Sequence, residues 1–556
     1  MSSKIFKISA VAATIAASFA ANAALYNVYL DETSGISPNT SRQIYGSAIS
    51  PETTVCWSNS CDADTSVMVT EVKYYREGFS YRDEAPFFLP FGWDYLDDNH
   101  SGFKDYCRNY LGYADTLCEN WATAQYTNGY AREQGGNYDS SIAYLDANRD
   151  GTATAVKAEN TVVNSINFSG GGPAVEPVGN ARNGGTNRNI GFVGSDSATY
   201  TIGDANFLSS HAWVSKTLAT NAGNRTFTLG SVTRNNVDTG NTKTFTSKPT
   251  VWLDVGSTRT EINWEGAKSE DGNSKAQGSA RDIILDSSDN NNVYAVGYTS
   301  DGSVRLKAAV FKSTDSGSTW KDFSNGSKLV SGFPYATEEY ANQTLQAVNN
   351  NKIAIGTAKL RRALNGAYAN TLFYVNSLDS PSYNGFAGSI FFEGANGLAG
   401  NINNYNDVVG TIDYEQHSET NGKPRAQRAF IANLSNVPGS SAPIGGQARY
   451  LDDLTYGSGV TADNNKFRVI QAADINDAGV IAATAYYCAA GFESEAIDAK
   501  CAAGAALAGV KLVPINGQDS GDISPRPVTQ TKVERQGGSL GILMLTVLGL
   551  LGFRRK

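Results

Sequence analysis

The chain has 556 residues and a formal net charge of −9 at pH 7. It contains no lysine run or basic patch, which argues against a nucleic-acid-binding function. Glycine (56), tyrosine (28) and phenylalanine (23) are abundant, whereas histidine and methionine number three each. This mixture is typical of short aromatic strands joined by Gly, Asn, Asp and Ser turns, so we expect a mainly β protein.

The first residues have the order of a secretory signal peptide. Lys4 and Lys7 precede an alanine-rich apolar run at 8–20, and Ala21-Asn22-Ala23 forms an A-x-A cleavage site. A first buried helix is the alternative. The order of charge, apolar run and small residues favours cleavage after Ala23, by signal peptidase.

The six cysteines form three closely spaced pairs in a chain that we expect to leave the reducing cytosol. A zinc site is the alternative, but the three histidines lie far from the cysteine pairs and no C-x-x-C spacing occurs. Short loops close at the least entropic cost, which favours local disulfides. The predicted pairs are Cys56–Cys61, Cys107–Cys118 and Cys488–Cys501.

One segment, at about 94–134, departs from the β pattern. Its apolar residues recur at helical spacing, so we expect a helical insertion that is stapled by the second cysteine pair. The aromatic residues either pack as a core or form a platform for a sugar or peptide, and core packing is preferred. They include Tyr106, Tyr110, Tyr113 and Trp121.

The segment Asp146-Ala147-Asn148-Arg149-Asp150-Gly151 resembles the start of a calcium loop. Alternating oxygen ligands before a glycine turn are what Ca²⁺ requires. The twelfth position is Lys157, where that loop needs a bidentate glutamate. Asp146, Asn148 and Asp150 are therefore a weak calcium candidate, with an Asx-rich surface turn as the alternative. No other cofactor is expected.

A pattern recurs through the middle of the chain, in copies whose spacing requires insertions. It consists of an apolar residue, an Asn- or Asp-rich turn, an apolar strand that often contains glycine, and a further strand with an aromatic residue. Such units bury their faces only by stacking or by radial arrangement, as in a propeller. Chance recurrence in an Asn- and Gly-rich chain is the alternative. The copies lie at 474–483; 401–410 with 428–431; 347–356 with 372–375; 283–297 with 308–311; and, more faintly, 165–194 with 211–214.

These units resemble HAF-type extracellular repeats, which combine an Ile-Asn-Asx-x-Gly turn, a Val-Val-Gly strand and a His-Ala-Phe strand. The match is clearest at 401–431 and 474–483, and His211-Ala212-Trp213 echoes the last element. The resemblance implies an uncharacterised family of exported repeat proteins and supplies no catalytic residue.

The segment 313–320 matches the Asp-box pattern S-x-D-x-G-x-T-W. Ser313 and Asp315 are suited to cap a tight turn, Gly317 to supply an unusual dihedral, and Trp320 to pack beneath it. The pattern resembles hairpins of sialidase-type propellers, where it is structural. It favours a β-propeller over a sandwich.

The last twenty residues resemble the GlyGly-CTERM sorting signal of Gram-negative bacteria. Gly537-Gly538-Ser539 leads a charge-free run to residue 553, and Arg554-Arg555-Lys556 follows. A helix over this run would be at the short end of what spans a bilayer, with its cations cytoplasmic. The resemblance implies cleavage near Gly537, Gly538 and Ser539 by a rhombosortase-type intramembrane protease, after transient inner-membrane anchoring. Release to the surface or medium through type II secretion would follow.

No catalytic constellation is evident. A G-x-S-x-G match at 537–541 opens the membrane segment and is rejected, and no P-loop, H-E-x-x-H or Rossmann glycine triplet occurs. His100, His211 and His417 are interpreted as structural or surface residues.

The predicted organisation is a signal peptide (1–23), a propeller-like repeat domain (24–514), a linker (515–536) and a transmembrane sorting tail (537–556). We expect an exported binding or structural module of the envelope or extracellular space, with an unknown extracellular ligand. The alternative is a secreted polysaccharide or glycoside hydrolase. A hydrolase should bring two or three carboxylates together at one end of the central channel with perturbed pKa values, whereas a binding module should show a polar or aromatic face.

Overall fold

The structure is a computed structural model that describes residues 23–529. Within that range it leaves out 33, 40, 85–95, 97, 169–173, 183–187, 236–244, 255–257, 273, 436, 438, 447, 461 and 462. The predicted leader up to residue 22 and the sorting residues Gly537, Gly538 and Ser539 lie outside the described residues. Of the helices that the structure describes, none is long and apolar enough to cross a membrane.

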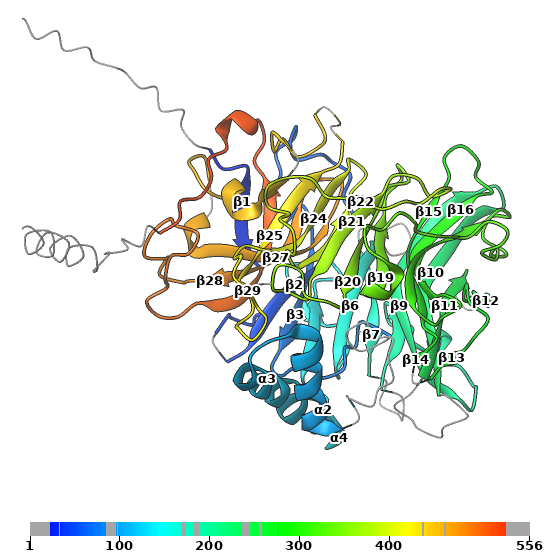
Figure 1. The fold of residues 1–556 in the computed structure, drawn as a ribbon. Coiled ribbons are helices and arrows are strands. Elements are labelled where there is room, and N and C mark those ends of the chain that lie inside the picture. Colours follow the sequence, from blue (N-terminus) through cyan, green and yellow to red (C-terminus); the bar gives the residue numbers. More distant parts are fainter. Residues whose placement is uncertain are drawn as a thin grey trace, which may run out of the picture.

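The strands form antiparallel sheets arranged as the blades of a propeller (Figure 1). Five blades are separate sheets of three or four strands. These are β6 (Thr161–Phe168), β7 (Val175–Ala181) and β8 (Ile190–Val193); β9 (Phe207–Thr220), β10 (Gly223–Asn235), β11 (Phe245–Leu253) and β12 (Thr258–Glu261); β15 (Gly278–Leu285), β16 (Val293–Ser300), β17 (Leu306–Ser313) and β18 (Lys328–Leu329); β19 (Tyr340–Val348), β20 (Ala354–Leu360), β21 (Asn370–Val375) and β22 (Asn384–Gly385); β23 (Gly397–Ile402), β24 (Asp407–Asp413), β25 (Gln427–Asn433) and β26 (Ala448–Tyr450).

An eight-stranded sheet supplies two further blades. Its halves meet through a single parallel pair, Gln43 with Leu507, so they are two blades in contact. One half contains β27 (Phe467–Ile475), β28 (Ile481–Tyr487), β29 (Ala506–Pro514) and β1 (Tyr26–Leu30), and the other contains β2 (Gln43–Ile49), β3 (Met68–Lys73), β4 (Ser141–Leu145) and β5 (Thr154–Ala155). Contacts between β2, β6, β9, β15, β19, β23 and β27 run from blade to blade around a closed ring.

Strand β1 closes that ring. It pairs antiparallel with β29, from Tyr26 opposite Pro514 to Leu30 opposite Val510, so the start of the described chain completes a blade made by its end. Residues 24–26 are fully buried, and Ala23 donates its backbone N–H to the carbonyl of Asp522 at 3.1 Å. Residues 515–529, the first part of the predicted linker, pack beside this blade.

The short elements outside the blades include the helical insertion, which lies below the sheets in Figure 1. It comprises α2 (Asn99–Tyr106), the π-helix η2 (Cys107–Leu111), α3 (Asp115–Ala122), the π-helix η3 (Thr123–Tyr130) and α4 (Ala131–Gln134). Tyr106 stacks on Trp121 with centroids 5.6 Å apart, and Phe103 is buried, so the aromatic residues form a core as preferred from the sequence. The remaining elements are the hairpin β13 (Glu270–Asp271) and β14 (Ser274–Lys275), η4 (Ala198–Tyr200), η5 (Thr337–Glu339), α5 (Leu451–Leu454), η6 (Asn464–Lys466) and η7 (Ser520–Asp522).

The three predicted disulfides are confirmed. Their Cα atoms lie 5.6, 5.4 and 5.8 Å apart for Cys56–Cys61, Cys107–Cys118 and Cys488–Cys501. The second joins η2 to α3 in the insertion, and the third closes the loop between β28 and β29. The predicted fold class, a mainly β propeller with a disulfide-stapled helical insertion, is therefore confirmed.

Four of the five predicted repeat copies correspond to single blades. Each begins on an inner strand, turns, and continues into the second strand, as at 401–410 in β23 and β24. The fifth copy was aligned wrongly, because Ser165 lies in β6, Gly191 in the third strand β8, and His211 in the inner strand of the next blade.

In addition to second breaks nearer the starts of β9, β19 and β27, every inner strand breaks register with its neighbour at a similar level. One extra residue is inserted there, which is a β-bulge. The seven bulge residues are Ser47, Asn164, Trp213, Arg281, Gln346, one of the pair Gly400 and Asn401, and Ala473. They form a bulge ring around the axis.

The glycine of the repeat pattern lies opposite the bulge. Gly297 pairs with Ala280, and a Cβ at Gly297 would lie 2.0 Å from the carbonyl oxygen of Ser279. Gly356 and Gly410 occupy the same position in the next two blades, where an added Cβ would lie 2.0 and 2.3 Å from the facing carbonyl oxygens. The recurring glycine is therefore required by the carbonyl group just before the bulge, which approaches it closely.

We expect Gly297→Ala to destabilise the protein by about 1–3 kcal/mol, because its methyl group collides with backbone that cannot move without breaking the bulge. Chemical denaturation measures this change. Gly302→Ala in the same blade is the matched control, since no atom lies within 4 Å of its added Cβ. Equal midpoints for the two variants would contradict the role assigned to Gly297.

Candidate functional site

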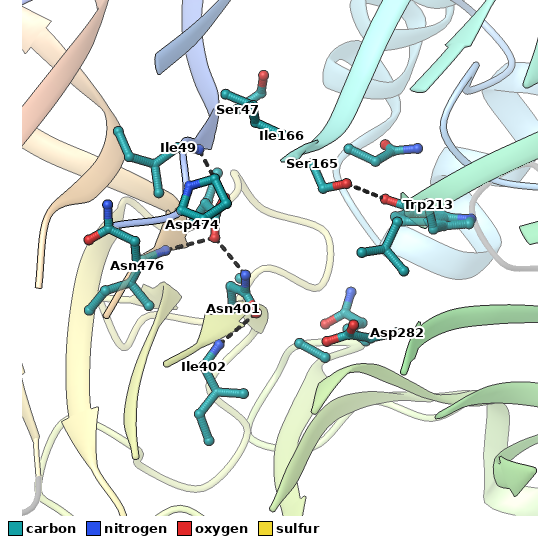
Figure 2. A pocket seen from close by; sticks show the side chains of 18 of the residues that line it. Ser47, Ile49, Ser165, Ile166, Trp213, Asp282, Asn401, Ile402, Asp474 and Asn476 are labelled. Atoms are coloured by element: carbon teal, nitrogen blue, oxygen red, sulfur yellow. Dashed lines mark hydrogen bonds between the residues drawn. The ribbon is translucent and has the colours of Figure 1, made fainter. Parts of the chain in front are cut away.

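The inner strands of all seven blades line one cavity of about 850 Å³ along the propeller axis (Figure 2). At the turn end its lining includes Thr53 and Asn350, which are exposed. At the other end it includes Arg76, which is exposed, and Leu398, which has a relative exposure of 43%. The cavity is therefore a channel between the two faces.

The asparagine-rich turns of the repeats link neighbouring blades at the turn end. The N–H of Asn350 donates to Asn404 Oδ1 at 2.9 Å, and the N–H of Asn404 donates to Asp477 Oδ1 at 2.8 Å. Asn476 Nδ2 then donates to the carbonyl of Ser50 at 2.9 Å. These contacts join four successive blades, so the Asn and Asp residues of the pattern hold the rim together.

Two aspartates near the bulge ring bind backbone from the next blade. Asp282 Oδ2 accepts the N–H of Val348, and Asp474 Oδ2 accepts the N–H of Ile49, both at 2.9 Å. The second oxygen of each accepts the N–H of the residue that follows it, at 2.8 Å. Each carboxylate thus fastens one inner strand to the next.

A neighbouring side chain also contacts the carboxylate of each of these two aspartates. Lys216 Nζ lies 2.6 Å from Asp282 Oδ1, and Asn401 Nδ2 donates to Asp474 Oδ1 at 2.6 Å; Figure 2 shows the latter contact. All four carboxylate oxygens are therefore occupied by protein donors. This arrangement suits strand positioning rather than proton transfer to a substrate.

Burial raises the pKa of Asp474 to about 6, against hydrogen bonds that lower it. A group whose pKa is raised in the folded state stabilises the protein fully at pH values below its unfolded-state pKa. That stabilisation is lost as pH rises through its folded-state pKa, about 6. Relative to Asp474→Asn, the wild-type free energy of unfolding should therefore increase by about 1–3 kcal/mol as pH falls from 7 to 4. Urea melts at several pH values measure this difference. A constant difference across that range would contradict the raised pKa.

The segment 76–84, which follows β3, enters the opposite end of the channel and forms its base. Glu84 is buried and accepts hydrogen bonds from four blade side chains, one of which is the Ser231 hydroxyl at 3.1 Å. Arg281 Nη2 and Trp213 Nε1 each donate to it at 3.1 Å, and the Tyr298 hydroxyl donates at 2.8 Å. Burial alone would raise the pKa of Glu84, but the Arg281 guanidinium holds it down, at about 2.

The neighbouring residues of the segment are also paired. Arg82 forms an ion pair with Glu71 and donates through Nε to Asn164 Oδ1 at 2.8 Å. Asp83 lies 3.2 Å from Arg281 Nη2, and burial raises the pKa of Asp83 to about 6. Three carboxylates do gather at one end of the channel, but each is bound to an arginine of the protein.

The other predicted site residues lie outside the channel lining. In the turn between β17 and β18, Asp315 Oδ1 accepts the N–H of Thr319 at 2.9 Å, and Ser313 Oγ accepts the N–H of Gly317 at 3.0 Å. Gly317 has a φ of 80°, and Trp320 packs against the adjacent core.

The candidate calcium loop forms a closed turn. Asp146 accepts the N–H groups of Asp150 at 3.1 Å and of Gly151 at 2.7 Å. Among the described residues no group of three or more His, Cys, Asp or Glu side chains is placed to hold a metal ion. Calcium binding by Asp146, Asn148 and Asp150 stays a prediction.

Sequence reasoning did not identify Glu84 or Arg281. They are 197 positions apart, and the contact between them depends on the path of the segment 76–84 into the channel. The repeat copy at 283–297 begins two residues after Arg281, so the pattern stops just short of the bulge.

A ring of blades around a polar channel defines the chain as a β-propeller protein. The chain belongs to the DUF3466 family, described as proteins of unknown function, whose model matches residues 229–556. No curated protein matches the sequence.

Several solved structures share a distant likeness. Putative TolB from Agrobacterium tumefaciens is 10% identical, over 54% of this chain and 84% of that one, with a TM-score of 0.27. The β-propeller domain of the Trilobed protease from Pyrococcus furiosus is 10% identical, over 63% and 84%, with a TM-score of 0.30. Trypanosoma rangeli sialidase in complex with sialic acid is 7% identical, over 88% and 57%, with a TM-score of 0.27. Similarities of this size transfer no function.

Proposed function

We propose that this protein is an exported propeller that binds a ligand in its axial channel without transforming it. The observation that supports binding over hydrolysis is the engagement of the channel carboxylates. Asp282 and Asp474 hold neighbouring strands, and Glu84 and Asp83 are bound to Arg281. A hydrolase needs an acid and a base that reach the substrate, whereas a binding site needs a fixed polar surface.

Blocking the channel tests this proposal. Ala473 is half-buried in the bulge ring and lines the cavity, so Ala473→Trp should fill it, while Ala473→Ser is the matched control. We expect a ligand found by thermal-shift screening of saccharides and peptides to stabilise the wild type and Ala473→Ser but not Ala473→Trp. Ligand turnover by the wild type that is lost in Asp83→Asn would instead support the hydrolase alternative.

Export is the second part of the proposal. It includes removal of 1–23 by signal peptidase, and anchoring and release through the tail at 537–556 by a rhombosortase-type protease and type II secretion. Three disulfides support an oxidising destination. The resemblances of the repeats to HAF repeats and of 313–320 to an Asp-box are part of this proposal.

Leader cleavage should precede closure of the ring. Residues 24–26, which follow the proposed cut, are fully buried, so a folded precursor cannot present them to a peptidase. Purified full-length precursor should resist signal peptidase when folded and be cut after Ala23 when unfolded. Mass spectrometry of the product checks this, and efficient cleavage of the folded precursor would contradict it.

A further inference from the structure

The bulge ring is divided into two unequal sectors. Asn164, Trp213 and Arg281 are neighbours on β6, β9 and β15, and all three bind residues 82–84 of the base segment. That sector is occupied by the protein's own chain. The other sector is formed by β19, β23, β27 and β2.

The second sector carries only uncharged residues at its bulges. They are Gln346, Gly400 with Asn401, Ala473 and Ser47. All of them line the channel. Among the described residues, the hydrogen bonds of residues 82–84 to the bulge ring go to Asn164, Trp213 and Arg281 instead.

Two oxygens in this sector lack partners. Gln346 Oε1 and Ser47 Oγ are buried, and neither has a hydrogen-bond partner among the described residues. An unsatisfied buried polar group costs about 1–3 kcal/mol. Rotation of either side chain toward a ligand hydroxyl in the channel would remove that cost. The two oxygens therefore favour a ligand that donates hydrogen bonds.

The charges around the sector disfavour an ionic ligand. The carboxylate of Asp474 already accepts hydrogen bonds from Ile49, Ile475 and Asn401. The lining cations Lys216 and Arg82 form ion pairs with Asp282 and Glu71. The lining residues of β2, β19, β23 and β27 include no lysine or arginine, so a charged ligand would lose its hydration against these strands without gaining a free counter-charge from them. Leu398 adds an exposed apolar surface to the same side.

We infer that the sector of β2, β19, β23 and β27 is a binding site for a neutral saccharide chain. Sugar hydroxyls donate and accept, which matches amide and hydroxyl side chains, and the C–H faces of a sugar match Leu398. This inference rests on the proposed binding function and names its ligand class.

Isothermal titration calorimetry with neutral hexasaccharides tests the inference. The probes are α-1,4-, β-1,4- and β-1,3-linked glucose hexamers and an N-acetylglucosamine hexamer, with a hexamer of a uronic acid and an uncharged hexapeptide as comparisons. At least one neutral hexamer should bind the wild type. Gln346→Leu and Ser47→Ala should each weaken that binding at least fivefold, whereas Gln134→Leu, at an exposed position in α4, should not change it.

Each other outcome has a defined meaning. Channel binding of only the peptide or the uronic acid, blocked by Ala473→Trp, would overturn the saccharide inference and leave the binding function standing. Neutral-saccharide binding that survives Ala473→Trp and Gln346→Leu would overturn the assigned site. If no probe binds, the ligand class is wrong. Circular dichroism and melting curves of each variant exclude misfolding as the cause of a loss.

Discussion

A chain that lacks residues 23–30 should fail to form a cooperatively folded propeller. The deletion removes β1 and with it the fourth strand of the closing blade. Leu25, Tyr26 and Val28 are at most 1% exposed, and each buried side chain of this size contributes about 1.5–3 kcal/mol. Their sum approaches the whole stability of a typical domain, about 5–15 kcal/mol. Denaturant unfolding should therefore show a broad transition at lower midpoint.

A peptide of residues 23–32 provides the matching rescue experiment. Added in excess to the truncated chain, it should restore the sharp transition by pairing with β29, whereas a scrambled peptide should not. A truncated chain that unfolds in one transition at the wild-type midpoint would show that β1 does not close the ring.

Glu84→Ala should cost about 3–5 kcal/mol, because it leaves the Arg281 guanidinium buried without its principal counter-charge. Side chains of both residues are fully buried, and their contact is 3.1 Å. The double substitution Glu84→Leu with Arg281→Met should recover only part of the loss. It removes the unpaired guanidinium, but it leaves Asp83, Trp213 and Tyr298 without the partners they have in the wild type. Guanidinium melts measure all three proteins.

An exposed ion pair supplies the control for this experiment. Arg305 lies 3.0 Å from Glu338, with side-chain exposures of 33% and 66%. Water screens such a pair, so Glu338→Ala should leave the midpoint nearly unchanged. If Glu84→Ala were equally mild, the base segment would not be fixed in the channel by Glu84.

The blades were predictable where the repeat was regular. The turns at 349–351, 403–406 and 476–479 recur because their side chains form hydrogen bonds to adjacent blades. The glycines recur because a backbone carbonyl of the inner strand faces each of them closely. The same physical causes make these features visible in a single sequence. Cysteine spacing likewise identified the three disulfides.

Other features depend on contacts between distant segments and leave no local pattern. The blade of β2–β5 is interrupted by the helical insertion. The blade of β9–β12 is built from strands of up to 14 residues. The base of the channel depends on the segment 76–84 reaching Arg281. Ring closure by β1 joins residues nearly 500 positions apart, as in the pair Tyr26 and Pro514.

Hydrogen–deuterium exchange with and without the tightest-binding saccharide tests the channel site most directly. Protection should increase in peptides that cover 43–49, 344–350, 397–404 and 470–477, which contain the bulges of β2, β19, β23 and β27. Peptides that cover the disulfide loop at 488–505 should not change. Protection of that loop or of the outer strands, with the four bulge peptides unaffected, would contradict a ligand site in the channel.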